Sequence, residues 1–399
     1  MTGYIFPDIT DIHQIQAAIA NKDEFFISDK GSYLVSNYSV SYSTTFPEIV
    51  DNNTAILREC RGIIFNKKTG KIIRRPWYKF FNIGEKNETN IKNLDFTQPH
   101  IVLEKLDGSM IAPFEVDGKI IYGSKMGETF LTPHIKEFVK KNPSYHFFTQ
   151  DCISKNNTPI FEFCSNKARI VISHPVDRLV LTGIRNNING NITDYNTMVE
   201  LAKLYNIEVV NAYHTHGIID NPEEFLEYTK NLRNAEGFVV RFDNGYMVKV
   251  KADEYILFHK TLDSLRFEKD VLVIVLTDKI DDTLPLVKGD LEYDLKKYND
   301  AVLSGLKELS TKLWNVVREA YDNTNGSKKD FAINYVNKNY KQYSPVLFSI
   351  WDLLEDGECA AFEVIKKYVL SHTSTGTKVD MVRYMWNNVR WRVNEITED

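Results

Sequence analysis

The first 260 residues alternate short apolar runs with polar turns, a pattern typical of β-strands. Val116-Asp117-Gly118 and Asp243-Asn244-Gly245 predict two hairpins, because these residue pairs tolerate the backbone angles of tight turns. Helices are predicted between the strands at about 11–21, 132–141, 195–205 and 222–233. The predicted strands are Tyr33–Ser36, Gly62–Phe65, Ile101–Glu104, Met110–Phe114, Lys119–Tyr122, Ile160–Phe163, Ile170–Ser173, Leu179–Ile184, Gly237–Phe242 and Tyr246–Val250.

The apolar period changes near residues 262–290 and is helical from about residue 290 onward. One apolar stripe runs through residues 291–321 and comprises Leu291, Leu295, Tyr298, Val302, Leu306, Leu309, Leu313, Val316 and Val317. Further helices are predicted at about 330–341, 345–355, 358–372 and 377–393. The chain is therefore predicted to be α+β, with antiparallel sheets flanked by helices in a domain of residues 1–262 and an all-helical domain of residues 263–399.

Composition narrows the class of protein. The chain has 399 residues, 43% hydrophobic and 26% charged, with a net charge of −5, so nucleic acid would have to bind through local basic patches. Four scattered cysteines, with no C-x-x-C spacing, indicate neither zinc nor a disulfide framework and suit a reducing cytoplasm. We expect no secretory signal and no membrane span, because no apolar run approaches the roughly 20 residues required.

Residues 104–109 contain a K-x-D-G motif formed by Lys105, Asp107 and Gly108. Lys105 follows an apolar strand, where burial and neighbouring cations could keep its amine neutral and nucleophilic. Gly108 permits a close approach of the backbone to a nucleotide. Taken alone, however, the motif is more typical of an exposed lysine before a turn.

Three further segments change that interpretation. Arg61 and Gly62 open a strand, and the planar fork of arginine suits a phosphate or a ribose edge. Glu162 lies between two phenylalanines, where a carboxylate can accept from a ribose hydroxyl or hold a hydrated cation. Lys249 and Lys251 project from the same face of a strand and would repel each other unless an anion lay between them. The alternatives are a surface arginine, an outward-facing acid and two solvated lysines.

The ordered motifs resemble those of covalent nucleotidyltransferases, and more closely the bacteriophage RNA ligase 1 family, over about residues 30–265. The matching stretches are Glu59-Cys-Arg-Gly-Ile, Lys79-Phe-Phe-Asn, Lys105-x-Asp-Gly-Ser, Ser124-Lys125, Phe161-Glu-Phe with Arg169-Ile-Val, Glu236-Gly, and Lys249-x-Lys251-x-x-x-Tyr255. One departure is Met126, which separates Lys125 from a glycine that follows the lysine directly in the family pattern.

The resemblance implies roles for individual residues. Lys105 would be the nucleophile that carries AMP. Lys249 and Lys251 would bind the α-phosphate and help keep Lys105 unprotonated. Arg61 and Lys79 would contact the triphosphate.

The acids and the remaining positions follow the same resemblance. Glu162 would contact the ribose, and Glu236 would lie near the metal. Lys125 and Tyr255 match further nucleotide-site positions, whereas Phe81 is interpreted as packing. Asp281-Asp282 resembles a paired-acid metal segment of the family, with a solvated turn as its alternative.

The implied reaction is ATP-dependent joining of 5′-phosphate and 3′-hydroxyl RNA ends through lysyl-AMP and an adenylylated RNA end. The cofactors would be ATP and Mg²⁺, with Mn²⁺ as a substitute, and the partner would be RNA, with tRNA repair as one use in the family. We expect a cytoplasmic monomer that binds no membrane and no protein partner. A DNA ligase or capping enzyme would carry an OB-type barrel where this sequence is helical. A catalytically idle nucleotide- or RNA-binding module is the other alternative.

Overall fold

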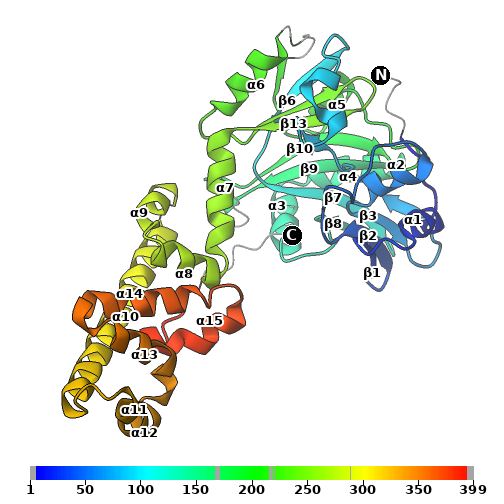
Figure 1. The fold of residues 1–399 in the computed structure, drawn as a ribbon. Coiled ribbons are helices and arrows are strands. Elements are labelled where there is room, and N and C mark those ends of the chain that lie inside the picture. The colour runs from blue at the N-terminus through cyan, green and yellow to red at the C-terminus, as the bar shows by residue number, and fades with distance from the viewer. Residues whose placement is uncertain (1–5, 167–170, 215–218, 220, 288, 393–399) are drawn as a thin grey trace. The chain divides into compact units, whose positions relative to one another are not determined.

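The computed structural model describes residues 6–166, 171–214, 219, 221–287 and 289–392 (Figure 1). The chain divides into two compact units, of which the first reaches Ile256 and the second begins at Leu257. The first unit mixes strands and helices, and the second is helical. The predicted α+β class is therefore confirmed.

Strands of the first unit form three sheets in the described residues. One sheet has the order β1 (Phe25–Asp29), β2 (Tyr33–Tyr38), β3 (Ile63–Asn66), β4 (Ile72–Arg74). The second has the order β10 (Arg178–Asn186), β9 (Asn157–Cys164), β7 (Ser109–Val116), β8 (Lys119–Gly123). The third has the order β11 (Ala212–His214), β6 (His100–Lys105), β12 (Gly237–Phe242), β13 (Met247–Lys251), β5 (Phe81–Asn82). Neighbouring strands run antiparallel except β13 and β5, which are parallel.

Both predicted hairpins are present. Asp117 and Gly118, with φ of 49° and 71°, turn β7 into β8 through the left-handed region that a tight hairpin requires. Gly245, with φ of 84°, makes the corresponding bend between β12 and β13. The second hairpin brings Lys249 and Lys251 back alongside the strand that follows Glu236.

Helices supply the apolar faces that cover these sheets. Ile135 of α3, Phe148 of α4 and Met198 of α5 are buried in the same cluster as Phe161 and Phe163 of β9. This packing fixes β9 from the side opposite Glu162, because residues alternate faces along a strand. The helices of the first unit are α1 (Ile12–Ile19), α2 (Asn52–Glu59), α3 (Thr132–Lys141), α4 (Ser144–Ser154), α5 (Tyr195–Leu204) and α6 (Pro222–Lys230), and α7 (Asp253–Leu265) runs across the unit boundary.

A buried ion cluster anchors the end of α2. Arg75 and Arg185 both donate to the carboxylate of Glu59, with Arg185 at 2.6 and 2.7 Å and Arg75 at 3.0 and 3.2 Å. These side chains are at most 1% exposed. Burial raises the pKa of Glu59, but the two guanidinium groups outweigh it and hold that pKa at about 2. The cluster fixes the chain just before Cys60 and Arg61.

The second unit has its own core, around the long helix α10. The predicted stripe faces inward, since Leu295, Tyr298, Val302, Leu306 and Leu313 are buried on α10. The helices are α8 (Glu268–Leu276), α9 (Ile280–Thr283), α10 (Asp290–Asn323), α11 (Lys328–Phe331), α12 (Asn337–Asn339), α13 (Ser344–Asp352), α14 (Glu358–Leu370) and α15 (Gly376–Val382).

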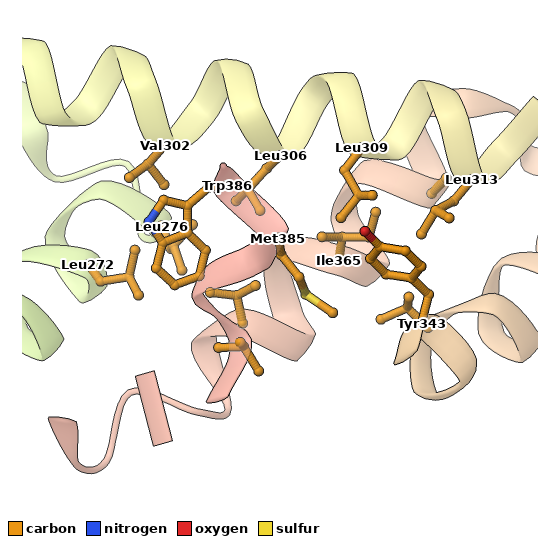
Figure 2. Close-up of a cluster of buried hydrophobic side chains, with 14 of the residues drawn as sticks. Leu272, Leu276, Val302, Leu306, Leu309, Leu313, Tyr343, Ile365, Met385 and Trp386 are labelled. Atoms are coloured by element: carbon orange, nitrogen blue, oxygen red, sulfur yellow. The ribbon is translucent and has the colours of Figure 1, made fainter. Parts of the chain in front are cut away.

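Trp386 is the largest side chain in that core and lies against α10 (Figure 2). A Cβ at Gly305 of α10 would lie 2.9 Å from the Cα of Trp386, so the absence of a side chain at Gly305 allows this close approach. The indole N–H of Trp386 donates to the carbonyl of Val389 at 2.9 Å, so the buried ring leaves no unsatisfied donor.

Two predicted elements are wrong. Residues 171–173 are not a strand, and the backbone N–H groups of Val171 and Ile172 donate to Asp107 instead of to a neighbouring strand. Ile170 lies outside the described residues. The helix predicted at 377–393 ends at Val382, followed by a 3-10 turn of Arg383–Trp386. Asn387 and Asn388 then take φ of 59° and 57°, which ends the helix.

Among the helices of the described residues, none is both long enough and apolar enough to cross a bilayer.

The Glu59 cluster predicts a loss of stability in acid. Because the folded pKa of Glu59 is depressed to about 2, its contribution is present at neutral pH and is lost as pH falls from about 4.5 toward 2. Glu59→Gln should lower the free energy of unfolding at pH 7 by about 3–5 kcal/mol, since two buried arginines lose their counter-charge. Urea unfolding at pH 7 and pH 3 measures both effects.

The variant should also lose less stability between those two pH values than the native chain does. Glu137→Gln, at an exposed ion pair, is the control and should change stability by less than about 1 kcal/mol. Equal acid sensitivity in Glu59→Gln and the native chain would contradict the assignment.

Candidate functional site

Strand register brings the K-x-D-G lysine beside two other predicted residues. Lys105 is the last residue of β6 and pairs with Gly237 of β12, and Gly237 pairs in turn with Lys251 of β13. Gly237 has φ of 141°, and a Cβ there would lie 2.0 Å from the carbonyl oxygen of Val250. Glycine is therefore required where these three strands meet.

One carboxylate joins the two lysines. Oε1 of Glu236 lies 2.7 Å from Nζ of Lys105 and 3.0 Å from Nζ of Lys251. The Glu236 side chain is 4% exposed, whereas those of Lys105 and Lys251 are 21% and 24% exposed. Burial raises the pKa of Glu236, but the two ammonium groups outweigh it, so the carboxylate is ionised.

The charge state of Lys105 differs from the sequence-based expectation. Burial lowers the pKa of Lys105, but the carboxylates of Glu236 and Glu162 outweigh it and raise the pKa above its ordinary value. Lys105 is therefore protonated in this arrangement. The expectation that Lys249 and Lys251 keep Lys105 unprotonated left out the carboxylate that lies between Lys105 and Lys251, and for the nucleotide-bound protein it stays a prediction.

Lys249 carries the depressed pKa instead. Burial, followed by the nearby charges of Lys105, Lys79, Lys251 and Arg61, lowers the pKa of Lys249 to about 7. Its Nζ lies 5.6 Å from the ring centroid of Phe80, and the Nζ of Lys251 lies 4.9 Å from that of Tyr255. The two lysines are two residues apart in β13 and leave the same face of the strand.

Glu162 lies on β9 opposite Met110 of β7. Burial, with a smaller effect from Glu236, raises the pKa of Glu162 to about 7 against the opposing effects of Lys105 and Arg61. This acid therefore changes charge near neutral pH, which is typical of functional sites.

Gly108 serves strand packing in this structure. A Cβ at Gly108 would lie 2.6 Å from the carbonyl oxygen of Phe163 and 3.0 Å from Cγ of Glu162. The glycine thus lets the turn after Lys105 lie directly on β9. The predicted close approach of a nucleotide to Gly108 stays a prediction.

Asp107 fixes the same turn. Its carboxylate accepts hydrogen bonds from the hydroxyl of Tyr255 at 2.8 Å and from the backbone N–H groups of Val171 and Ile172 at 2.9 and 2.5 Å. Its carbonyl lies 2.7 Å from Nε2 of His174. Burial and neighbouring acids raise the pKa of Tyr255, so the phenol stays a donor. Tyr255, predicted from the resemblance alone, is thus a direct partner of the motif.

Three more predicted cations gather at Tyr38, a residue that sequence reasoning missed. Nζ of Lys125 lies 4.2 Å and Nζ of Lys79 lies 5.2 Å from its ring centroid. Burial raises the pKa of Tyr38, but Arg61, Lys79 and Lys125 outweigh it and lower the pKa overall. Nothing in the local sequence Ser36-Asn-Tyr-Ser distinguishes Tyr38, so only the fold reveals it.

Phe81 lies at the same group of cations. Nζ of Lys79 lies 5.4 Å and the guanidinium carbon of Arg58 lies 4.8 Å from its ring centroid. The ring is buried in the cluster of Phe46 and Phe65. Its interpretation as a packing residue fits this burial, and its face also contacts two positive charges.

The departure at Met126 is accommodated by a turn. Ser124 and Gly127 exchange backbone hydrogen bonds at 2.8 and 3.1 Å, and Gly127 has φ of 86°. The sulfur of Met126 accepts from Nδ2 of Asn37 at 3.0 Å. The extra residue therefore sits within the turn, and Lys125 still faces Tyr38.

The paired acids Asp281 and Asp282 lie on α9 of the second unit and are exposed. Across the described ranges, no group of three or more histidine, cysteine, aspartate or glutamate residues is arranged to hold a metal ion. A metal role for this pair stays a prediction.

Comparison with known proteins identifies the family. Residues 59–256 match the RNA ligase family of the T4 RNA ligase 1 type. A protein of Thermovibrio ammonificans named "Putative RNA ligase" is 32% identical over 302 residues, which cover 70% of this chain and 75% of the relative. RNA ligase 1 of bacteriophage TS2126 is 33% identical over 90 residues, 22% of each chain. The chain therefore belongs to the RNA ligase family, a class of enzymes, as the ordered motifs predicted.

Solved structures show more distant similarity. A Naegleria gruberi RNA ligase mutant with ATP and Mn has 17% identity and a TM-score of 0.36, covering 45% of this chain and 56% of that one. An archaeal ATP-dependent RNA ligase has 12% identity and a TM-score of 0.43, and the match covers 64% of this chain and 65% of that one. The matched region thus spans less than two thirds of either solved chain.

The two lysine pKa values predict unequal chemical reactivity. In the ligand-free protein, trace acetylation followed by mass spectrometry should give Lys249 a reactivity midpoint near pH 7. Lys105 should become reactive only above the ordinary lysine range, because Glu236 holds its proton. Glu236→Gln should move the Lys105 midpoint to lower pH, since burial and the surrounding cations then act without that carboxylate.

Glu128→Gln, which removes an exposed ion pair with Lys136, is the matched control. It should leave the reactivity midpoints of Lys105 and Lys249 unchanged. A Lys105 midpoint below that of Lys249 in the native chain would refute the assigned charge states.

Proposed function

We propose that the protein is an ATP-dependent RNA ligase that joins 5′-phosphate and 3′-hydroxyl ends, with Lys105 as the covalent carrier of AMP. One observation carries most of the argument. Within the segment that matches the RNA ligase family, strand pairing brings Lys105, Glu236 and Lys251 together at a single carboxylate oxygen.

The cations around this group suit a triphosphate. Arg61, Lys79 and Lys125 gather at Tyr38. The positive charges of Lys79 and Arg61 also lower the pKa of Lys249. Each chemical step is an in-line displacement at phosphorus, in which positioning and charge neutralisation supply most of the rate enhancement. Numerous cations beside few acids therefore match this chemistry.

Lys105 must lose its proton before it attacks. Its nitrogen then forms a bond to the α-phosphorus of ATP, and the bond from that phosphorus to the bridging oxygen breaks to release pyrophosphate. The 5′-phosphate of RNA next takes AMP from Lys105, and a 3′-hydroxyl displaces AMP from that end. In the ligand-free protein Glu236 holds the proton on Lys105, so this ion pair has to open before the first step.

Glu162 and Glu236 are the residues that would hold Mg²⁺, or Mn²⁺ in its place. Glu236 is one of the charges that raise the pKa of Glu162, and both carboxylates raise the pKa of Lys105, so the three groups interact electrostatically. Mg²⁺ typically takes one or two carboxylates together with substrate phosphates. When bound, the metal would supply charge neutralisation at the phosphates. Asp281 and Asp282 are a further proposed pair of metal ligands.

The helical region is proposed to contribute to the choice of RNA, and a broken tRNA loop is one candidate substrate. Tyr343, Trp386 and Trp391 are at most 8% exposed and pack in its core, so they are not available for base stacking. Tyr335 and Tyr340 are only partly buried there. We propose a cytoplasmic monomer.

Lys105→Ala should abolish covalent labelling of the protein by ATP that carries ³²P at the α-phosphate. The native chain should form an acid-labile, base-stable adduct, because the linkage is a phosphoramidate. Lys119→Ala, an exposed lysine at the start of β8, is the control and should label fully. Equal labelling of Lys105→Ala, with its fold intact by circular dichroism, would contradict the proposal.

Substrate class is tested by sealing. The native chain should circularise a 5′-phosphorylated single-stranded RNA with ATP and Mg²⁺, with activity that falls as salt rises, because phosphate contacts are screened. It should not use GTP, and it should seal nicked duplex DNA poorly. Preference for nicked DNA would indicate a DNA ligase, labelling by GTP a capping enzyme, and ATP binding without labelling or sealing an idle module.

A further inference from the structure

Arg74, on β4, is a fully buried cation whose hydrogen bonds all go to backbone. It is 0% exposed, and across the described part of the chain its guanidinium pairs with no carboxylate. Its donors instead reach the carbonyl oxygens of Gly62 (2.7 and 3.0 Å), Ala112 (3.1 Å), Gly123 (3.3 Å), Ser124 (2.8 Å) and Lys125 (3.3 Å).

Burying a charge without a counter-charge costs desolvation free energy, which other interactions of the guanidinium have to offset. Burial lowers the pKa of Arg74 to about 9. The face of Phe114, 5.4 Å from the guanidinium carbon, provides a weak partner. The remaining stabilisation of the charge has to come from the backbone carbonyls. These carbonyls belong to three separate chain segments.

Two of those segments carry residues of the proposed nucleotide site. Gly62 follows Arg61 directly, and the other segment ends at Lys125. A Cβ at Gly62, where φ is 87°, would lie 2.5 Å from the carbonyl oxygen of Lys125 and 2.9 Å from Nη2 of Arg74. The two segments therefore meet at the guanidinium without room for another atom.

The side chains on these segments converge on one feature. Nζ of Lys125 lies 4.2 Å from the ring centroid of Tyr38, and the charges of Arg61 and Lys125 both lower the pKa of that phenol. A change in the spacing of the two backbones would move these cations relative to each other. Lysine at position 74 could reach one or two carbonyls but could not span the set, because it lacks the planar fork.

We propose that Arg74 is a positioning residue that sets the spacing between Arg61 and Lys125 and so shapes the phosphate-binding side of the site. The inference rests on the proposed function, because it assigns these two cations to the nucleotide. Arg74 itself, fully buried, does not touch the substrate.

A double-mutant cycle tests the inference. Arg74→Lys, Lys125→Ala and the double variant are compared for the dissociation constant of α-labelled ATP and for the single-turnover rate of covalent labelling. Arg74→Lys should weaken ATP binding about tenfold or more in the native background. In the Lys125→Ala background its effect should fall to less than about threefold, because the residue it positions is gone. An equal loss in both backgrounds would overturn the proposal.

Arg241→Lys is the matched control, since Arg241 is also buried, at 5% exposure, but lies at the far end of β12 from Gly237. It should leave ATP affinity within about twofold of native, even if it lowers the melting temperature. An ATP affinity that follows melting temperature in both variants would mean that Arg74 acts only through stability, and would overturn the proposal.

A second variant covers the case in which Arg74→Lys does not fold. Gly62→Ala pushes a methyl group between Arg74 and the Lys125 carbonyl without removing a charge, so it should weaken ATP binding and show the same coupling to Lys125→Ala. Native affinity in Gly62→Ala would overturn the inference. A native chain that neither binds ATP nor becomes labelled would instead refute the proposed function, so the two failures are distinct.

Discussion

One buried carboxylate, that of Glu236, organises the centre of this molecule. Two lysines from different strands meet at the same oxygen, and neither could be placed so close to the other without that negative charge between them. The three strands that supply the group depend in turn on Gly237, which removes the side chain that would collide with β13. A triphosphate would meet cations held in place by an acid that already neutralises part of their charge.

The same carboxylate determines the charge of Lys105, the proposed nucleophile, in the ligand-free protein. Cations alone would favour a neutral Lys105, which is the usual argument for lysine nucleophiles. Here the acids outweigh burial, and the depressed pKa falls on Lys249. The protonation of Lys105 therefore depends on whether Glu236 remains its partner. If Lys105 is the nucleophile, as proposed, its activation requires that this ion pair open.

Three buried arginines hold the backbone on which residues of the candidate site are carried. Arg75 and Arg185 hold Glu59, and Arg74 holds the backbone of Gly62 and Lys125. Glu59 precedes Arg61 in the chain and Gly62 follows it, so the chain is held on both sides of Arg61. Arginine suits this use because it never loses its charge at physiological pH and donates in several directions from one plane.

The sequence by itself determined many of the strands and helices, both hairpins, the helical stripe of α10 and the family, because these depend on local periodicity, turn chemistry and ordered motifs. It did not predict β1, α2 or α4. Among the residues it predicted are Lys105, Glu236 and Lys251, which the structure brings together. It missed Tyr38 and Arg74, and it left out the effect of Glu236 on the pKa of Lys105. Those features depend on distances between segments far apart in the chain, and a pKa follows from burial and neighbours. Only the tertiary structure decides which charges face each other, since strand pairing, and not sequence spacing, brings Glu236 to Lys105.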